Sequence, residues 1–369
     1  MQKDRRNFLK TGLLYGGLSL LPGLPNIYAT SSTSRKGENF PPAEPTPAQK
    51  AWMDLKFGMF IHFGLNTFIG KEWGDGTHDP KSYNPKELDT DQWCETAKKA
   101  GMKYMVLVCK HHDGFCNWFT KQTDYSVKST TFRRDLLKEL RSSADKYGLK
   151  LGVYYSLWDR HEKIHDTDEP AYIEFMKRQL KELLTSYGEI VEVWLDGFWK
   201  KQQSGWKDEA GNWSEPEDFM KAWRNEGAYR WQIDHLYQYI KSFQTDCIVM
   251  NNATTKFPGV PLFPVDALCG EKAFGLTEYK KTWNWLGKEV FLPLQIETTM
   301  SIQGDDEFKS GSWFWHEGDH SVLSKERIYE YLETARKLGA NLLLNCGPMA
   351  NGKLRPEDVG MLSGLNLKN

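Results

Sequence analysis

Short apolar runs recur along the chain and are separated by longer segments with a helical pattern. Each run is apolar at nearly every position instead of alternating with polar residues, which indicates strands of a sheet that is covered on both faces. The eight runs occupy residues 57–63, 104–109, 151–156, 190–195, 247–251, 267–270, 292–298 and 340–345.

The helical patterns lie between several of these runs, and each is followed at once by a glycine, which is a common stop signal for a helix. They cover residues 88–100, 135–147, 172–187 and 325–338. Strands that alternate with helices, eight times over, predict an α/β fold of the (β/α)8, TIM-like barrel type. The fifth to seventh units are the least regular, and the pattern does not locate their helices.

The first 34 residues are expected to form a leader outside the fold. Residues 5–10 read Arg-Arg-Asn-Phe-Leu-Lys, a twin-arginine pattern, and an apolar stretch at 11–24 follows. This order is typical of a bacterial signal peptide. Glycines and prolines interrupt the stretch, which argues against a transmembrane helix. We therefore expect an exported protein, periplasmic or secreted.

The segment after the leader, residues 35–48, is rich in Ser, Thr, Pro and Lys and is interpreted as a linker. Residues 49–369 are expected to form one catalytic barrel, because a chain of this length suffices for a single domain of that kind. Within it, the polar segment 200–226 is expected to form a long loop over the site or a solvated insertion.

Composition excludes some functions and leaves others open. The 48 Lys and Arg residues balance 49 Asp and Glu residues for a net charge of -1, which gives no support for binding nucleic acid or anionic membranes. The 15 Trp, 16 Tyr and 19 Phe residues suit stacking on sugar rings, although a large barrel also buries many aromatic side chains. We find no His or Cys spacing typical of a metal site, and we expect no cofactor.

Two carboxylates stand where the chemistry of a barrel is expected. Asp196 directly follows the run 190–195, and Glu271 directly follows the run 267–270. Barrel enzymes carry their catalytic groups at the carboxyl ends of the strands. A pair of carboxyl groups, one ionised and one held protonated, is the apparatus that cleaves glycosidic bonds.

Several motifs in order resemble glycoside hydrolase family 29, the retaining α-L-fucosidases, over about residues 50–357. They read Phe-Ile-His-Phe-Gly at 60–64, Glu-Trp at 72–73, Lys-His-His-Asp-Gly-Phe at 110–115, Val-Trp-Leu-Asp-Gly at 193–197, Gly-Glu at 270–271, Trp-Phe-Trp-His at 313–316 and Asn-Leu-Leu-Leu-Asn at 341–345. The resemblance implies a retaining exo-α-L-fucosidase that acts on terminal α-L-fucose of fucosylated oligosaccharides or glycoconjugates.

The sequence around Asp196 is more similar to the branch of the family that cleaves α-1,3/1,4-linked fucose, and the broad-specificity branch is the alternative. That branch usually has Gly-Asn-Glu where this chain has Cys269-Gly270-Glu271. Many members also carry a C-terminal β-sandwich. Because this sequence ends soon after its last expected strand, we expect a barrel without it, either by nature or by truncation.

The resemblance also implies residue roles. Asp196 is expected to be the nucleophile and Glu271 the general acid/base, with the two carboxyl groups about 5 to 5.5 Å apart as retention requires. Glu297, at the end of the seventh run, is the rival acid/base or else a buried structural carboxylate. A non-catalytic fucose-binding barrel, or a barrel hydrolase for another sugar, remains an alternative to the fucosidase.

The expected sugar-binding residues are His62, Glu72, Trp73, His111, His112, Tyr155, Trp194 and Trp315. Neutral imidazoles can hydrogen-bond sugar hydroxyls in fixed directions. Because successive side chains of a strand point to opposite faces, only one of Tyr154 and Tyr155 can face the barrel centre. We expect this residue to be Tyr155. Trp313 is the alternative to Trp315, and core packing is the alternative role for either residue.

Overall fold

The computed structural model describes residues 43–197, 231–252, 264–273, 275–285, 288–303 and 311–367. The chain divides into Met1–Pro41 and Pro42–Asn369, and every described residue belongs to the second unit. The predicted signal peptide and the predicted loop at 200–226 lie outside the described residues.

Eight parallel strands close into a barrel in the order β1-β10-β9-β6-β5-β4-β3-β2. All eight predicted runs supply one strand each, and the (β/α)8 prediction is confirmed. The strands are β1 (Phe57–Ile61), β2 (Tyr104–Lys110), β3 (Lys150–Ser156), β4 (Glu192–Asp196), β5 (Ile248–Asn251), β6 (Ala267–Glu271), β9 (Leu294–Thr299) and β10 (Asn341–Asn345).

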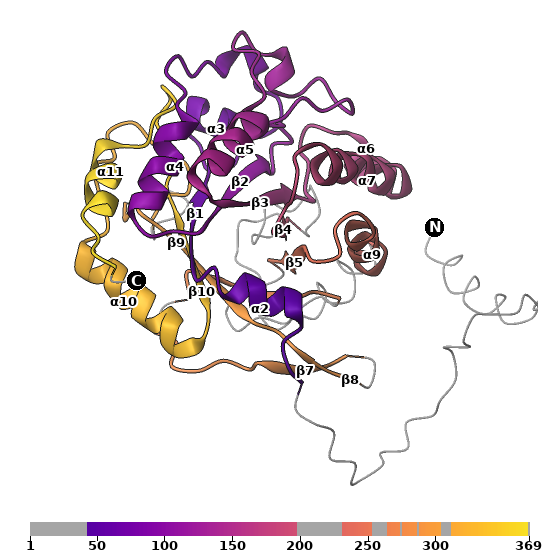
Figure 1. Cartoon of the computed structure of the whole chain (residues 1–369). Coiled ribbons are helices and arrows are strands. Elements are labelled where there is room, and N and C mark those ends of the chain that lie inside the picture. The colour runs from indigo at the N-terminus through magenta and orange to yellow at the C-terminus, as the bar shows by residue number, and fades with distance from the viewer. Residues whose placement is uncertain are drawn as a thin grey trace, which may run out of the picture. The chain divides into compact units, whose positions relative to one another are not determined.

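The four predicted helices are present, and helices surround the strands in Figure 1. Gly148 and Gly339 end two of them with φ of 65° and 67°, the left-handed conformation that glycine adopts at low cost. The helices are α2 (Pro47–Met53), α3 (Leu65–Ile69), α4 (Thr90–Lys99), α5 (Leu136–Tyr147), α6 (Ile164–Thr167), α7 (Glu169–Ser186), α9 (Ile233–Phe243), α10 (Lys325–Leu338) and α11 (Pro356–Ser363), with short 3-10 turns η1 (Pro80–Ser82) and η2 (Val127–Ser129).

A two-stranded hairpin lies between β6 and β9. It consists of β7 (Thr282–Trp285) and β8 (Lys288–Phe291), which pair antiparallel with Thr282 opposite Phe291. The hairpin lies outside the barrel in Figure 1. It explains why this part of the sequence gave no helical pattern, since its residues have the β-branched and aromatic character of strands.

Helix α2 packs against the strand ends opposite to those that carry Asp196 and Glu271. The Trp52 indole donates to Glu192 Oε2 at 2.6 Å, and the Asn341 amide donates to the Trp52 carbonyl at 2.9 Å. Glu192 and Asn341 are the first residues of β4 and β10. The helix begins at Pro47, so residues predicted as the end of a linker already belong to the fold.

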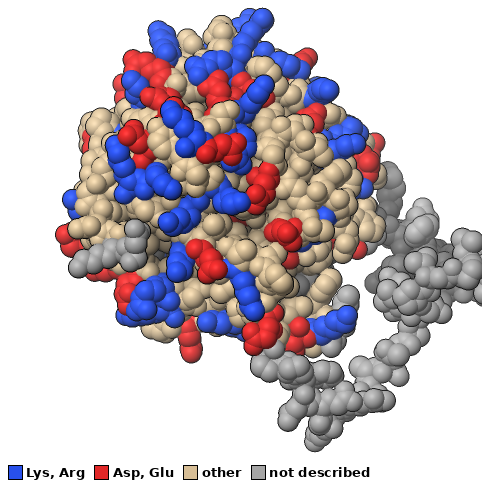
Figure 2. Space-filling view, viewed as in Figure 1, with Lys and Arg blue, Asp and Glu red and all other residues tan. Residues whose placement is uncertain are grey.

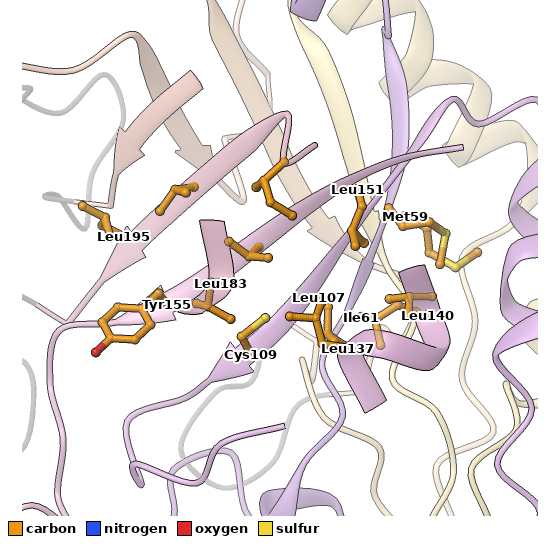
Figure 3. Close-up of a cluster of buried hydrophobic side chains, with 14 of the residues drawn as sticks. Met59, Ile61, Leu107, Cys109, Leu137, Leu140, Leu151, Tyr155, Leu183 and Leu195 are labelled. Carbon is orange, nitrogen blue, oxygen red and sulfur yellow. The ribbon is translucent and has the colours of Figure 1, made fainter. Parts of the chain in front are cut away.

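The barrel strands are buried on both faces. The inward side chains pack into one cluster that includes Phe60, Val106 and Trp194, whereas the outward ones pack beneath the helices in a second cluster. Figure 3 shows part of this second cluster, in which Leu151 and Leu195 from the strands lie near Leu137 and Leu183 from the helices. Burial on both faces explains the uninterrupted apolar runs in the sequence.

A buried ion pair lies within the outer cluster. Lys110 Nζ lies 3.1 Å from Asp159 Oδ2, and the two side chains are 0% and 3% exposed. The ammonium also donates to the hydroxyls of Tyr155 and Tyr172 and to Gln179 Oε1. These contacts join the end of β2 to the loop after β3 and to α7.

Positive and negative side chains are interspersed on the face that Figure 2 shows, and neither sign forms a separate patch there. This agrees with the balanced charge of the sequence. Within the described residues, no helix combines the length and the apolar character needed to cross a membrane.

We predict that the substitution Lys110→Met lowers the free energy of unfolding by about 3–5 kcal/mol, because it leaves the buried Asp159 carboxylate without its cation. Urea denaturation of the full chain measures this. The double variant Lys110→Met/Asp159→Asn should lose less free energy of unfolding than the two single variants lose together.

The matched control is Glu189→Gln, which removes one partner of the exposed ion pair with Lys150. Exposed pairs contribute little, so the midpoint should stay nearly unchanged. A Lys110→Met variant as stable as this control would contradict the prediction.

Candidate active site

Asp196 is the last residue of β4, at the carboxyl end of the barrel strands. The residue is 7% exposed, and its carboxylate accepts hydrogen bonds from Tyr154 Oη at 2.7 Å and from the Gly197 amide at 2.8 Å. Burial, and then the charge of Glu271, raises the pKa of Asp196 to about 7, while hydrogen bonds from Tyr154, Gly197 and Asn252 oppose the rise.

Glu271 is the last residue of β6 and is exposed. Its Oε2 accepts a hydrogen bond from Asn252 Nδ2 at 2.7 Å. The Asn252 backbone amide donates to the carbonyl of Leu195, the residue before Asp196, at 2.8 Å. Asn252 therefore connects the strand end that carries Asp196 to the Glu271 side chain, although the two carboxylates lie far apart in the sequence.

Asn252 is a site residue that the sequence reasoning missed. It directly follows β5, where Asn251-Asn252 ends an apolar run with two amides. A polar residue at the carboxyl end of a barrel strand was the signal that singled out Asp196, and the same signal could have found Asn252.

Glu297, the rival acid/base, lies deeper in the barrel. It is fully buried and accepts hydrogen bonds from Trp194 Nε1 at 3.2 Å, Gln295 Nε2 at 3.2 Å and the Gly270 amide at 2.9 Å. Burial raises its pKa well above the ordinary value, and the hydrogen bonds from Trp194 and Gln295 oppose this. Its carboxyl group is thus occupied by protein donors.

The three predicted histidines lie together beside Asp196. Ring centroids are 5.9 Å apart for His62 and His111 and 4.1 Å apart for His111 and His112. Burial lowers the pKa of His62 to about 3 and the pKa values of His111 and His112 well below the ordinary value. All three imidazoles are therefore neutral at physiological pH.

The neighbours of these rings fix which nitrogen carries the proton. His62 Nδ1 lies 2.7 Å from Asn345 Oδ1, so Nδ1 donates and Nε2 is an acceptor. The Asn345 amide orientation follows from its Nδ2, which donates to the Trp313 carbonyl at 2.7 Å.

The other two histidines are set in the same way. His112 Nδ1 lies 2.8 Å from Ser156 Oγ, and that hydroxyl donates to the Trp158 carbonyl, so His112 Nδ1 donates and Nε2 is an acceptor. Asn66 Nδ2 donates to the Glu72 carbonyl and also faces His111 Nδ1, which makes Nε2 of His111 a donor. The cluster offers both acceptors and a donor, as a row of sugar hydroxyls requires.

Glu72 has contacts in the site region that the sequence did not predict. Its carboxylate accepts hydrogen bonds from the backbone amides of Trp313 and Phe314 at 3.0 and 3.1 Å and lies 2.8 Å from His316 Nε2. These contacts hold residues 313–316 beside His62. A role in binding sugar hydroxyls stays a prediction.

The predicted tryptophans lie at different depths. The Trp73 ring meets His112 edge-on with centroids 5.4 Å apart, and Trp194 stacks on Tyr154 at 5.0 Å. The ring centroids of Trp313 and His62 are 5.0 Å apart. Among the described residues, no ring contact is found for Trp315, which is half-buried.

The choice of Tyr155 as the inward residue of β3 was wrong. Tyr154 packs inside the barrel and donates to Asp196, whereas the Tyr155 hydroxyl donates to Gln179 Oε1 on α7 at 2.6 Å. Figure 3 shows Tyr155 among the outward hydrophobic side chains. The period of two separates the two faces of a strand but does not say which face is inner when both are buried.

In the described part of the chain, no group of three or more His, Cys, Asp or Glu side chains is arranged to hold a metal ion. The adjacent histidines are accounted for by their hydrogen bonds to Ser156 and Asn66. The chemistry that this arrangement offers is that of two carboxyl groups beside neutral hydrogen-bonding rings.

We predict that Asp196→Asn stabilises the fold at pH 8 and has little such effect at pH 4. Because the folded pKa of Asp196 is raised from 3.8 to about 7, its contribution to stability is present below about pH 4 and is lost as pH rises to about 7. The variant should gain up to about 4 kcal/mol over the wild type. Urea denaturation at both pH values measures this, and a stability difference that does not change between them would contradict the assignment.

Comparisons with known proteins place this chain in a family. The family model described as Alpha-L-fucosidase matches residues 75–366. Alpha-L-fucosidase 1 of Arabidopsis thaliana is 33% identical over 86% of this chain, and the chain spans 58% of that relative's length.

Solved structures agree in fold. A glycoside hydrolase 29 family member from an unknown rumen bacterium is 28% identical with a TM-score of 0.66, over 87% of this chain and 56% of the other. Alpha-L-fucosidase isoenzyme 1 from Paenibacillus thiaminolyticus is 25% identical with a TM-score of 0.65, over 86% of this chain and 74% of the other. With a family model that matches most of its length, the chain belongs to the alpha-L-fucosidase family.

Proposed function

We propose that this protein is a retaining exo-α-L-fucosidase that removes terminal α-L-fucose from glycans by double displacement. The observation that carries the proposal is the placement of Asn252, whose side chain donates to Glu271 at 2.7 Å and whose backbone amide donates to the Leu195 carbonyl next to Asp196 at 2.8 Å. A pair of carboxyl groups at the same end of one barrel suits retention, and membership of the fucosidase family supplies the sugar.

In the first step, ionised Asp196 attacks the anomeric carbon of fucose and forms a glycosyl ester. The bond from that carbon to the leaving oxygen breaks, and the oxygen takes a proton from Glu271. In the second step, Glu271 removes a proton from water, whose oxygen binds the anomeric carbon and releases Asp196. Two inversions give net retention. The separation of about 5 to 5.5 Å between the carboxyl groups is part of this proposal.

Glu271 is the better candidate than Glu297 for the acid/base role. A general acid must lie within hydrogen-bond reach of the leaving oxygen and must exchange protons with water. Glu271 is exposed at the open end of the barrel, whereas Glu297 is fully buried and accepts from three protein donors.

The sugar is proposed to bind over the histidine cluster. The acceptor nitrogens of His62 and His112 and the donor nitrogen of His111 would bind hydroxyls, as their fixed tautomers allow. The Trp313 ring beside His62 gives the apolar face that suits the methyl group of a 6-deoxy sugar or the face of the leaving sugar.

We also propose that the substrate linkage is α-1,3 or α-1,4, on the basis of the Glu-Val-Trp-Leu-Asp-Gly wording at 192–197. The test is incubation with a Lewis-type trisaccharide, 2′-fucosyllactose and an aryl fucoside, with the released fucose measured. Turnover of the trisaccharide alone is the expected result.

Turnover mainly of the aryl fucoside would instead indicate the broad-specificity alternative. Fucose binding without hydrolysis of any of the three would indicate the non-catalytic barrel and would contradict the proposed function. Release of galactose, and not fucose, from matched aryl glycosides would indicate a different sugar preference.

Export is proposed from the twin-arginine pattern at Arg5-Arg6, with a periplasmic or secreted enzyme as its product. The double substitution Arg5→Lys/Arg6→Lys should block export in a bacterial host, because the twin-arginine pathway recognises both arginines. Cell fractionation with fucosidase assay or immunoblotting measures this. Equal export of the wild type and the variant would contradict the proposal.

A further inference from the structure

The buried carboxyl group of Glu297 has an unusual set of partners, because each of them is a donor. Its Oε1 accepts from the Trp194 indole and from the Gln295 amide, and its Oε2 accepts from the Gly270 backbone amide. The side chain itself is fully buried. A buried carboxylate without such donors would carry a large desolvation cost.

Two of the three donors belong to the strands that carry the catalytic carboxylates. Gly270 directly precedes Glu271 on β6, and the Glu297 carbonyl also accepts from the Lys272 amide at 2.8 Å. Glu297 therefore holds the backbone on both sides of Glu271. In the sheet register, Glu271 and Glu297 are direct partners.

The third strand contact crosses the barrel. Trp194 lies two residues before Asp196 on β4 and therefore on the same face of the strand. Strands β4 and β9 are not neighbours, because β5 and β6 lie between them in the sheet order. The bond from Trp194 to Glu297 therefore connects β4, which carries Asp196, to β9 through the barrel interior, and the Gly270 contact links β9 to β6, which carries Glu271.

A second layer of hydrogen bonds fixes Glu297 from below. Gln295 Nε2 donates to Glu297 Oε1 and to Glu192 Oε1, each at 3.2 Å, while Gln295 Oε1 accepts from Tyr104 Oη at 2.7 Å. Glu192 in turn accepts from Trp52 of α2. A continuous series of bonds thus runs from the closed end of the barrel to Glu297.

We propose that Glu297 is a positioning residue that sets the relative placement of Asp196 and Glu271 by hydrogen-bonding the β4 indole of Trp194 and the β6 backbone at Gly270. This inference rests on the proposed function of the site. It assigns Glu297 no contact with substrate and no proton transfer to the leaving oxygen.

The chemistry of the donors makes the role specific to a carboxylate. In Glu297→Gln, one oxygen becomes an NH2 group, which must then face either the Gly270 amide or the donors on Trp194 and Gln295. Two donors would point at each other in either orientation. The variant keeps the size of the side chain but loses at least one contact to a catalytic strand.

The test compares three full-length variants: Glu297→Gln, Glu271→Gln and Asp358→Asn. For Glu297→Gln we expect kcat to fall about 100-fold, the cost of a displacement of about 1 Å at a reacting centre, with KM changed far less. The same factor is expected for a glycan and for an aryl fucoside with a good leaving group, and azide should not restore turnover.

Glu271→Gln serves as the comparison for a true acid/base. Its loss should be large for the glycan and much smaller for the activated aryl fucoside, and azide should restore turnover. Asp358→Asn is the matched control, because it removes a buried carboxylate that pairs with Arg355 and lies outside this network. It should lower Tm but leave kcat within about twofold.

A second measurement does not depend on fucosidase activity. In wild-type protein labelled with 15N-tryptophan, the indole proton of Trp194, assigned with Trp194→Phe, should resonate downfield because it donates to a carboxylate. Glu297→Gln should move it upfield, and Asp358→Asn should not. If no fucoside is cleaved by the wild type, the proposed function fails while this measurement still tests the contact.

A folded Glu297→Gln variant with wild-type kcat would overturn the proposal, as would azide rescue with leaving-group dependence, which would make Glu297 the acid/base. Should Glu297→Gln fail to fold, Trp194→Phe removes the cross-barrel bond while keeping an aromatic ring beside Tyr154. A loss of about tenfold in kcat for that variant supports the proposal, and unchanged kcat contradicts it.

Discussion

The carboxyl groups of Asp196 and Glu271 lie at the same end of this barrel, where Asn252 donates through its side chain to Glu271 and through its backbone amide to the Leu195 carbonyl next to Asp196. Burial of Asp196, and then the charge of Glu271, raise the pKa of Asp196 to about 7. Hydrogen bonds from Tyr154 and Gly197 oppose the rise and favour the ionised form. The pair is thus arranged so that one carboxyl can be charged while its neighbour handles a proton.

The barrel interior supports this arrangement with polar groups of its own. A series of hydrogen bonds joins Trp52, Glu192, Gln295 and Glu297, and the inward apolar side chains of the barrel surround it. Buried carboxylates reduce stability unless donors surround them. Their presence beneath the catalytic strand ends suggests that the fold gives up stability for a fixed geometry where the reaction takes place.

The strands could be predicted from the sequence, because a parallel barrel covered by helices requires strands that are apolar on both faces. Asp196 and Glu271 could be found for a related reason, since a charged residue directly after such a run falls at the carboxyl end of a strand. The hairpin β7–β8 was not predicted, because short exposed strands carry no continuous apolar run.

The finer features of the site could not be predicted from the sequence. A period of two could not decide between Tyr154 and Tyr155, since both faces of β3 are buried. The contacts of Glu72 with the backbone of Trp313 and Phe314 bridge more than 200 positions of sequence, as their numbers show. The partners of Glu297 likewise come from three separate strands, so the sequence could offer it only as a rival acid/base or a structural carboxylate.

The proposed mechanism requires Asp196 to become covalently attached to the sugar. The most direct measurement is incubation with a 2-fluoro-fucosyl fluoride, which slows hydrolysis of the ester, followed by proteolysis and mass spectrometry of the peptides. We predict a fluorofucosyl label on Asp196 and on no other residue. A label on a different carboxylate, or a product of inverted anomeric configuration by NMR, would contradict it.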